Sequence, residues 1–447
     1  MNEWMNSISH RLLSISIPIS HQQVDLATLR QLVFERGACQ YPRLKQRVIY
    51  AGDVPYWDPV EFRIENHVFA AGVDHIDEAG LREYIHQIWG KPLPEHLPMW
   101  QFQLIENYDG GNSAVLFRIH HCYADGLSLV GFLLDLVDNN PFAKQEKDSS
   151  ESKRSKILYN PPVSPTANSR YANQAPVTSD GKKHEVGFKR PPMLKLIANQ
   201  LVFPVRMIQR AFSSPDHNAL HKPGKVLHGT RRVTWTERID LDRIKAIKNM
   251  AQVSLNDVLL SCVSGAFRRY FEFAKQPLIE DIRTNVPISM RPSHDEKVLD
   301  NKFTIVQVQL PVGEPDIKKR LQQTKATMDV LKVSDEPLGN YLSQLVLTKL
   351  PGTLTKFILT SLANKTTATC SNVPGPSSPL YIGGRKMHDL MFWVPSLSSV
   401  GVGCSLISYN GGFRLGVCVD TSLCNDPQQL SKGFVEELDE LYRIYVQ

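Results

Sequence analysis

The sequence lacks the signatures of several common protein classes. No stretch approaches the ~20 consecutive apolar residues that a membrane-spanning helix requires. The seven cysteines include no C-x-x-C pair, so neither a zinc site nor a disulfide framework is indicated, and we expect reduced intracellular thiols. There is no P-loop and no G-x-G-x-x-G, which excludes the common phosphate-binding loops. The N-terminus shows no basic region followed by an apolar core, so we expect no secretory signal.

Positive charge is concentrated in one segment. Residues 144–225 hold 15 lysines and arginines against 6 acidic residues, a net charge of +9, whereas the whole chain carries +6. Within it, residues 147–183 are rich in Ser, Pro, Asn and Lys, which is typical of a linker. We therefore expect an N-terminal part over 1–143, a basic linker over 144–225 and a C-terminal part over 226–447. Because the basicity is local and not interleaved with aromatic residues, we expect no nucleic-acid partner.

The hydrophobic periodicity on both sides of this linker predicts a mixed α/β protein. Before the linker we expect strands over 11–19, 100–106 and 114–120, and helices over 25–36 and 127–137. After it we expect strands over 231–239 and 303–310, helices over 241–250, 254–270, 315–331 and 427–445, and a hairpin turn at 409–412.

The segment His120-His121-Cys122-Tyr123-Ala124-Asp125-Gly126 lies in the loop between a predicted strand and a predicted helix. Acyl transfer to a hydroxyl needs a base that is neutral near pH 7, and histidine, with an ordinary pKa of ~6.5, suits that role. An Asp four residues later can fix such a loop by pairing with an arginine, and Gly126 permits close backbone approach. The alternative is an ordinary strand end followed by an Asp-Gly turn. A zinc site is less well supported, because neighbouring side chains of a strand point to opposite sides and no third ligand is placed.

In this context the segment resembles the H-H-x-x-x-D-G motif shared by chloramphenicol acetyltransferase, carnitine acyltransferases, plant BAHD enzymes and peptide-synthetase condensation domains. More closely, the chain resembles the wax ester synthase/acyl-CoA:diacylglycerol acyltransferase family. Five further segments match that family's motifs in order, with Met99 in place of its usual Leu: Tyr41-Pro42-Arg43-Leu44-Lys45-Gln46-Arg47-Val48, Leu97-Pro98-Met99-Trp100, Ser254-Leu255-Asn256-Asp257-Val258, Asn285-Val286-Pro287-Ile288-Ser289-Met290-Arg291-Pro292 and Ser371-Asn372-Val373-Pro374-Gly375-Pro376.

The resemblance implies two chloramphenicol acetyltransferase-like subdomains with a tunnel between them and His121 midway along it. It implies an O-acyltransferase that moves a long-chain acyl group from acyl-CoA to diacylglycerol, to a long-chain alcohol, or to both. Neither a metal nor a cofactor is needed, since acyl-CoA is a substrate. His121 is the expected base, His120 shapes the loop, and Cys122 is dispensable because no acyl-enzyme forms.

Further site residues follow from the same resemblance. It places Asn256 and Asp257 beside the active centre, with Asn256 able to donate to an oxyanion. The spacing of Ser254 and Asp257 has a second explanation, a capping box that starts a helix. Asp125 is expected to be structural and to pair with one of three arginines, Arg43, Arg47 or Arg291.

Two other functions remain open from the sequence. One is a condensation-type acyltransferase that takes its acyl group from a carrier protein, and the other is a non-catalytic lipid-binding protein. For location, residues 194–212 place apolar residues at helical intervals among Lys195, Arg206 and Arg210. That pattern predicts either a helix lying on an anionic membrane or one packed on the protein's own core. The expectation is a peripheral protein of the endoplasmic reticulum, the inner face of the plasma membrane or lipid droplets.

Overall fold

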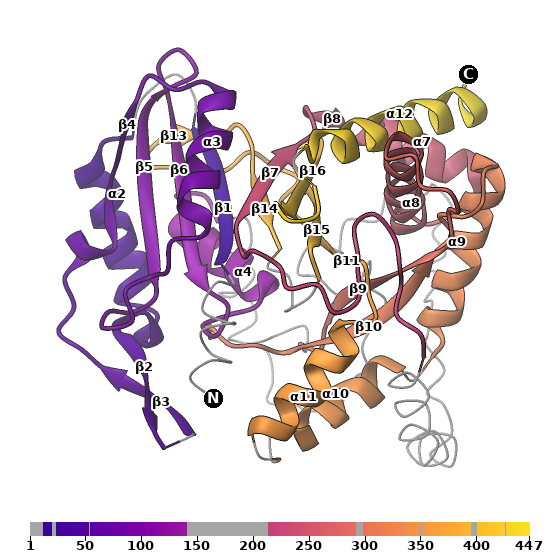
Figure 1. The fold of residues 1–447 in the computed structure, drawn as a ribbon. Helices are drawn as coiled ribbons and strands as arrows, with labels where there is room; N and C mark the ends of the chain where they lie inside the picture. Colours follow the sequence, from indigo (N-terminus) through magenta and orange to yellow (C-terminus); the bar gives the residue numbers. More distant parts are fainter. Residues whose placement is uncertain are drawn as a thin grey trace, which may run out of the picture.

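The structure, a computed structural model, describes residues 12–19, 24–52, 54–140, 213–291, 298–334, 336–347, 350, 352–394, 400–424 and 426–447. These residues form two large sheets that lie side by side, each with its own helices, and two small two-stranded sheets (Figure 1). The expected segment 194–212 lies outside the described residues, so neither of its two interpretations is tested.

The first sheet has five strands, and it carries most of the N-terminal part. Its strands are mutually antiparallel except for β4 and β5, which run parallel. In spatial order they are β14 (Met391–Trp393), β1 (Leu12–Ile19), β6 (Asn112–His120), β5 (Trp100–Tyr108) and β4 (Val68–Asp74). The same part contains α2 (Leu26–Leu32), the π-helical turn η1 (Val33–Ala38), the 3-10 turns η2 (Pro42–Lys45) and η3 (Ile64–Asn66), the hairpin β2 (Gln46–Ala51) and β3 (Val54–Pro59), α3 (Glu78–Trp89) and α4 (Gly126–Leu136).

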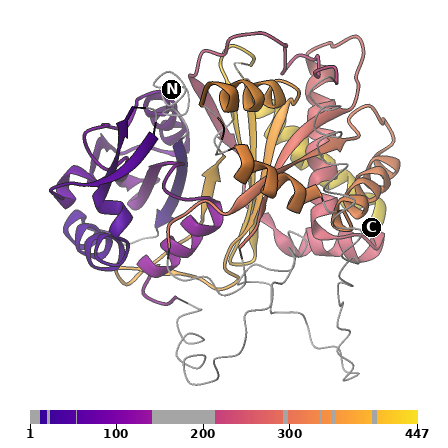
Figure 2. The same cartoon turned by 90° about the horizontal axis from the view of Figure 1, so that it is seen from below.

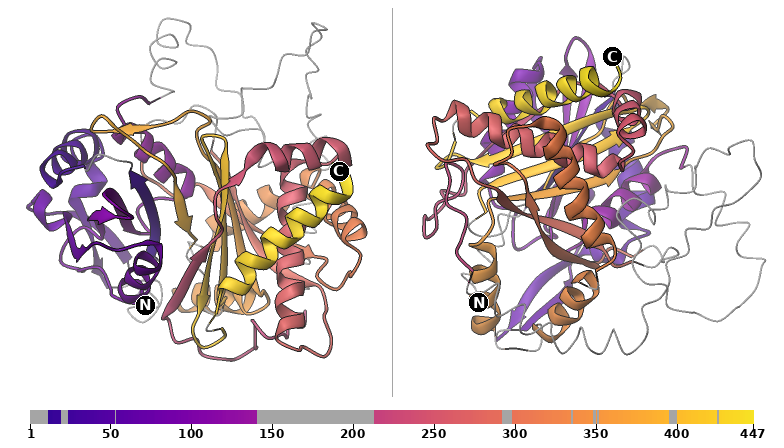
Figure 3. Two further views of the ribbon diagram at one scale, coloured as in Figure 1. Left: turned by 90° about the horizontal axis from the view of Figure 1, so that it is seen from above. Right: turned by 90° about the vertical axis from the view of Figure 1, so that its right-hand side faces the viewer.

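The second sheet is larger and lies in the C-terminal part. Its order is β10 (Phe303–Leu310), β9 (Ile282–Ser289), β11 (Ala368–Pro374), β15 (Val402–Tyr409), β16 (Gly412–Asp420) and β7 (Arg231–Trp235), with β8 (Ile239–Asp240) pairing to β16. Helices α7 (Leu241–Ala251), α8 (Leu255–Phe273), α9 (Ile317–Lys332) and α12 (Gln428–Tyr445) cover one face (Figure 3). Helices α10 (Glu336–Leu347) and α11 (Gly352–Ala363) lie near the edge strand β10 (Figure 2). Two short strands, β12 (Tyr381–Ile382) and β13 (Arg385–Lys386), pair with each other.

The chain crosses back between the two parts. Strand β14 follows β11 in sequence, yet it adds to the first sheet by pairing with β1, with Phe392 opposite Ile15. Phe392 and Val394 accordingly belong to the same hydrophobic core as Phe102 and Phe117 of the N-terminal part. The two parts are therefore interlocked by a shared sheet. The division at residues 143 and 226 stays a prediction, because 141–212 are not described.

Most of the expected elements are present. The hairpin expected at 409–412 is confirmed: β15 and β16 are joined by Asn410 and Gly411, whose φ angles of 44° and 74° are those of a tight turn. The helix expected over 25–36 ends as an α-helix at Leu32 and continues as the π turn η1. The strand expected over 231–239 is interrupted after Trp235 and resumes as β8. Helices α3, α10 and α11, strand β4 and the β2–β3 hairpin lie outside the elements expected from the sequence.

The close approach of the backbone at Gly375 to strand β15 can be tested by substitution. A Cβ at this position would lie 2.1 Å from the carbonyl oxygen of Ser408, on the neighbouring strand β15. We expect Gly375→Ala to force these backbones apart and to lower the free energy of unfolding by ~1–3 kcal/mol. Gly131→Ala, in α4, is the matched control, because a Cβ there meets nothing within 4 Å. A urea titration in which both variants unfold like the parent protein would contradict this account.

Candidate active site

The histidine segment forms a short loop between two rigid elements. Strand β6 ends at His120, and α4 begins at Gly126. Asp125 is the N-cap of α4, and its Oδ1 accepts a hydrogen bond from the amide of Ser128 at 3.0 Å. An aspartate in this position satisfies an amide that the first turn of a helix leaves without a partner. Both ends of the loop are thus fixed by regular secondary structure.

The other oxygen of Asp125 is held by the C-terminal part. Its Oδ2 accepts from Nη2 of Arg291 at 2.7 Å and from the amide of Lys302 at 2.8 Å. The side chains of Asp125 and Arg291 are only 7% and 12% exposed, so this is a buried ion pair. Desolvation alone lowers the pKa of Arg291, but the hydrogen bonds and negative charges of Asp125 and Asp300 outweigh it and raise that pKa. Arg291 therefore remains a cation at every physiological pH.

Of the three arginines expected as partners, only Arg291 pairs with Asp125. Arg43 instead donates to the carbonyl of Leu299 at 2.6 Å and lies over the ring of Trp57. Arg47 forms an ion pair with Asp58 across the β2–β3 hairpin at 2.9 Å. Spacing alone could not choose among the three, because the partner of Asp125 lies 166 residues away in the sequence.

Residues 298–302 form a strap across the outside of the histidine loop. Asp300 accepts the amide of Asp125 through its carbonyl at 3.1 Å, and Ser128 donates from its hydroxyl to the carbonyl of Val298 at 3.1 Å. The side-chain amide of Asn301 donates to the carbonyls of His121 at 2.9 Å and Cys122 at 3.2 Å. Three residues of the loop and one in the first turn of α4 are thus hydrogen-bonded to the strap. No motif in the sequence indicated this strap.

The two histidines differ in environment. His120 is 1% exposed, and its Nδ1 accepts from the amide of Cys122 at 3.2 Å, which leaves the hydrogen of the neutral ring on Nε2. His121 is half-buried, and its ring lies against that of Phe303 on β10, with centroids 5.5 Å apart. His121 is therefore the histidine with solvent access at the junction of the two parts.

Tyr123 is a residue that the sequence did not single out, and it connects three motifs. It is fully buried, its hydroxyl donates to the carbonyl of Gln46 at 2.6 Å, and the same oxygen accepts from the amide of Met99 at 3.1 Å. The neighbouring Trp100 is also fully buried and donates from its indole to the carbonyl of Leu44 at 2.8 Å. The segments Tyr41–Val48 and Leu97–Trp100 are thus hydrogen-bonded to each other and, through Tyr123, to the histidine loop.

The surroundings of Cys122 do not favour the thiolate form of its side chain. Burial raises the pKa of its thiol to about 12, against the smaller opposing effects of a backbone hydrogen bond and of Arg43. The reactive form of cysteine is the thiolate, so almost none is present near pH 7.

The Asn-Asp motif has the structure of a helix start. Ser254 and Asp257 form a complete capping box at the N-terminus of α8, with hydrogen bonds of 2.8 and 3.2 Å. The buried Asn256 accepts at its Oδ1 from the side-chain amide of Asn372 at 2.5 Å, which joins this motif to the end of β11. The capping box accounts for Ser254 and Asp257, and a role for Asn256 at an oxyanion stays a prediction.

Among the described residues, a Cβ at Gly126 would meet only the side chain of Val373, at the ordinary contact distance of 3.7 Å. The expectation that Gly126 permits a close backbone approach stays a prediction. The contact does locate β11 beside the start of α4. Because successive side chains of a strand point to opposite faces, Val373 faces α4 while Asn372 faces α8.

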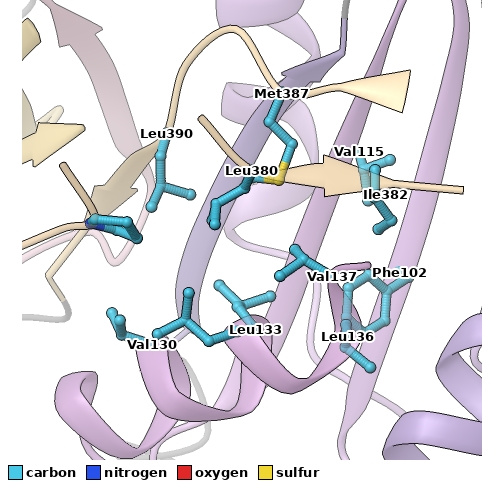
Figure 4. Close-up of a pocket in the computed structure, with 12 residues that line it drawn as sticks. Phe102, Val115, Val130, Leu133, Leu136, Val137, Leu380, Ile382, Met387 and Leu390 are labelled. Atoms are coloured by element: carbon cyan, nitrogen blue, oxygen red, sulfur yellow. The ribbon is translucent and has the colours of Figure 1, made fainter. Parts of the chain in front are cut away.

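An apolar cavity lies against the inner side of α4, between this helix and the chain that follows β11 (Figure 4). It is bounded by α4, by β5 and β6, and by the chain that follows β11, with Val130, Phe102, Val115, Leu380 and Met387 among its lining residues. Its volume is only about 20 Å³, whereas sites for drug-sized ligands occupy some 300–1,000 Å³. It is therefore a small packing defect, and the tunnel expected between the two parts stays a prediction. Among the described residues, no three His, Cys, Asp or Glu side chains are grouped as metal ligands.

The comparisons with known proteins cover nearly the whole chain. The wax ester synthase/diacylglycerol acyltransferase catalytic domain matches residues 11–259, and the C-terminal domain of the same family matches residues 299–442. A probable diacylglycerol O-acyltransferase of Mycobacterium tuberculosis is 24% identical over 97% of this chain and 90% of its own length. An O-acyltransferase of Acinetobacter baylyi is 26% identical over 86% of this chain and 82% of its own.

Solved structures show the same fold. A wax ester synthase/diacylglycerol acyltransferase from Marinobacter aquaeolei superposes with a TM-score of 0.60 at 17% identity, covering 98% of this chain and 96% of its own. The first condensation domain of the CDA synthetase superposes with a TM-score of 0.61 at 14% identity, covering 100% and 94%. The fold is thus one that this chain shares with a wax ester synthase/diacylglycerol acyltransferase and with condensation domains. Within that class, the chain belongs to the wax ester synthase/diacylglycerol acyltransferase family.

The buried ion pair gives the first test of the site. Breaking such a pair from one side leaves an uncompensated buried charge, so we expect Arg291→Ala to cost ~3–5 kcal/mol and to lower acyl transfer with it. Asp125→Asn should cost less, because Arg291 keeps its ion pair with Asp300, but it too should lower both stability and acyl transfer. The matched control is Arg47→Ala, which breaks a pair that is about one-third exposed, so we expect at most ~1 kcal/mol. Calorimetric melting curves measure the loss of stability in the two variants and in the control. An inactive Asp125→Asn protein with unchanged melting would instead assign Asp125 a direct part in the chemistry.

Tyr123 provides a second test. Tyr123→Phe keeps the ring but leaves the carbonyl of Gln46 and the amide of Met99 without their buried partner. We expect a loss of ~1–3 kcal/mol in the free energy of unfolding. Tyr56→Phe serves as the control, because Tyr56 is 51% exposed. Equal denaturation midpoints for the two variants would remove Tyr123 from the support of the loop.

Proposed function

We propose that this protein is an O-acyltransferase that moves a long-chain acyl group from acyl-CoA to a hydroxyl acceptor. The acceptors are diacylglycerol, which gives triacylglycerol, and long-chain alcohols, which give wax esters. One observation carries the proposal: His121 lies on a loop that a buried ion pair and a strap fix from the opposite part of the chain. A general base must be held in a defined place, and this loop supplies that constraint.

The proposed reaction proceeds by direct transfer. His121 removes the proton of the acceptor hydroxyl as the oxygen attacks the thioester carbonyl, which forms a tetrahedral intermediate with a negative oxygen. Collapse of the intermediate breaks the carbon–sulfur bond. The CoA thiolate then takes the proton from the His121 imidazolium, and the products are an ester and free CoA.

The neighbouring residues fit this division of roles. His120 is buried and its Nδ1 is occupied by the amide of Cys122, which suits a residue that shapes the loop. The raised pKa of Cys122 argues against an acyl-enzyme on sulfur. Asn256, which is buried in the first turn of α8 beside Asn372, remains the proposed donor to the oxyanion.

A substitution series at the loop tests the base. We expect His121→Ala to lower turnover by ~10²-fold or more with unchanged melting, because the half-buried ring makes little contribution to the core. His120→Ala should lower activity less, and Cys122→Ala should retain it. Turnover is measured as release of free CoA. A His121→Ala protein with near-normal turnover would refute the mechanism, and a larger effect at His120 would mean that the base is misassigned.

The substrates need an assay of their own. Purified protein is incubated with radiolabelled palmitoyl-CoA and either diacylglycerol or hexadecanol, and the lipid products are separated by thin-layer chromatography. Labelled triacylglycerol or wax ester supports the proposal and ranks the two acceptors. Transfer only from the same acyl group on a carrier protein would favour a condensation-type enzyme. Lipid binding without transfer from either thioester would leave a non-catalytic lipid-binding protein.

The proposed location is peripheral, on a membrane or a lipid droplet. Diacylglycerol and long-chain alcohols reside in lipid phases, and none of the described helices is long and apolar enough to cross a bilayer. Contact with the lipid surface is therefore proposed to occur through the outside of the protein, with the segment 194–212 as the first candidate from its sequence pattern.

A further inference from the structure

The proposed base, His121, is packed against an aromatic side chain to which the sequence assigned no role. The ring of Phe303, at the start of β10, lies against the imidazole of His121, with 5.5 Å between the ring centroids and 52° between the ring planes. Both side chains are half-buried. Rings at this separation are in contact, and such a contact favours some orientations of the imidazole over others.

Phe303 points away from the hydrophobic core of the C-terminal part. Further along β10, Val306 and Val308 are buried in the core that this strand forms with α8 and α9. Since successive side chains of a strand alternate between its two faces, Phe303 lies on the other face, the one turned towards the histidine loop. Burial in that core therefore does not explain why a phenylalanine occupies this position.

The backbone that carries the Phe303 ring is fixed by its neighbours. Phe303 pairs with Ser289 of β9 in the second sheet. The preceding residue, Lys302, accepts from the amide of Met290 through its carbonyl at 2.8 Å and donates from its own amide to Oδ2 of Asp125, also at 2.8 Å. The ring is thus carried by the same stretch of chain that holds the start of α4.

This stretch holds the backbone and the side chain of His121 by different contacts. The side-chain amide of Asn301 donates to the backbone carbonyl of His121 at 2.9 Å, and two residues further on the Phe303 ring meets the imidazole. A phenyl ring has no hydrogen-bonding group, so its contact restrains the imidazole without occupying a ring nitrogen. A general base needs such a restraint, because the nitrogen that takes the proton must be aimed at the acceptor hydroxyl.

We infer that Phe303 is a positioning residue for His121: its ring confines the imidazole to the orientation in which the base takes the proton of the acceptor. The inference rests on the proposed function, because His121 acts as a base only in that reaction. An imidazole that is free to turn is aimed elsewhere for part of the time. The rate of the chemical step then falls, while the binding of both substrates is little changed.

Substitutions at Phe303 test the positioning role by separating kcat from KM. We expect Phe303→Ala to lower kcat by ~10-fold or more, with the KM values for palmitoyl-CoA and hexadecanol within about twofold of those of the parent protein. Phe303→Leu keeps much of the apolar volume, so it should melt like the parent protein and still lose kcat. Phe303→Tyr keeps the ring and should restore most of kcat.

The matched control for these variants is Phe69→Ala. Phe69 is also a half-buried phenylalanine on an edge strand, and its strand β4 lies well apart from β10 (Figure 1). We expect Phe69→Ala to keep the kcat of the parent protein. Melting curves show which variants fold, and if Phe303→Ala does not, the kcat of Phe303→Leu decides in its place.

A second readout does not require acyl transfer. Diethyl pyrocarbonate modifies neutral imidazoles, and mass spectrometry measures the modification of His121 relative to that of the exposed His217. We expect this ratio to rise in Phe303→Ala, because one side of the imidazole is uncovered, and to stay unchanged in Phe69→Ala.

The outcomes separate the positioning role from the proposed function. Equal kcat values for Phe303→Ala and Phe69→Ala would overturn the inference, as would a raised KM with unchanged kcat, which would place Phe303 on the path of a substrate only. An unchanged modification ratio in Phe303→Ala would also overturn it. No transfer by the wild type would instead count against the proposed function, and the modification ratio would still decide whether Phe303 confines the imidazole.

Discussion

The buried ion pair between Asp125 and Arg291 is the interaction on which the site depends. Removing two charges from water is costly, and such a pair is stable only when both partners keep good hydrogen bonds. Asp125 meets that condition: its two oxygens accept from the amides of Ser128 and Lys302 as well as from Arg291. The pair thus fixes the start of α4 against the C-terminal part, and the position of His121 follows from it.

The position of His121 is consequently a property of the whole chain. The loop that holds it comes from the first sheet, whereas Arg291 and the strap residues 298–302 follow β9 and precede β10. Strand β14 adds a third link, because it leaves the C-terminal part to pair with β1. A base held from both sides suits a reaction in which two large substrates must meet at one point, and it means that neither part alone would be expected to be active.

Sequence reasoning identified local features better than distant ones. The histidine loop, the hairpin at Asn410-Gly411 and the capping box at Ser254 are encoded by adjacent residues, and the structure places all three as their spacing indicates. The sequence narrowed the partner of Asp125 to three arginines but could not choose among them. Which arginine lies beside Asp125 depends on how the chain passes between its two parts and on which side chains become buried there. Tyr123 and Asn301 act through backbone groups of remote segments, for which no sequence pattern exists.

The claim that both parts of the chain hold the base through one ion pair is tested most directly by a double-mutant cycle. Turnover of acyl-CoA and the free energy of unfolding are measured for Asp125→Ala, Arg291→Ala and the protein with both changes. The account predicts strong coupling in both quantities, by ~1–3 kcal/mol, so that the double variant loses clearly less than the sum of the two single variants. Effects that simply add, with coupling below ~0.5 kcal/mol in turnover, would show that the two residues act independently and would contradict the account.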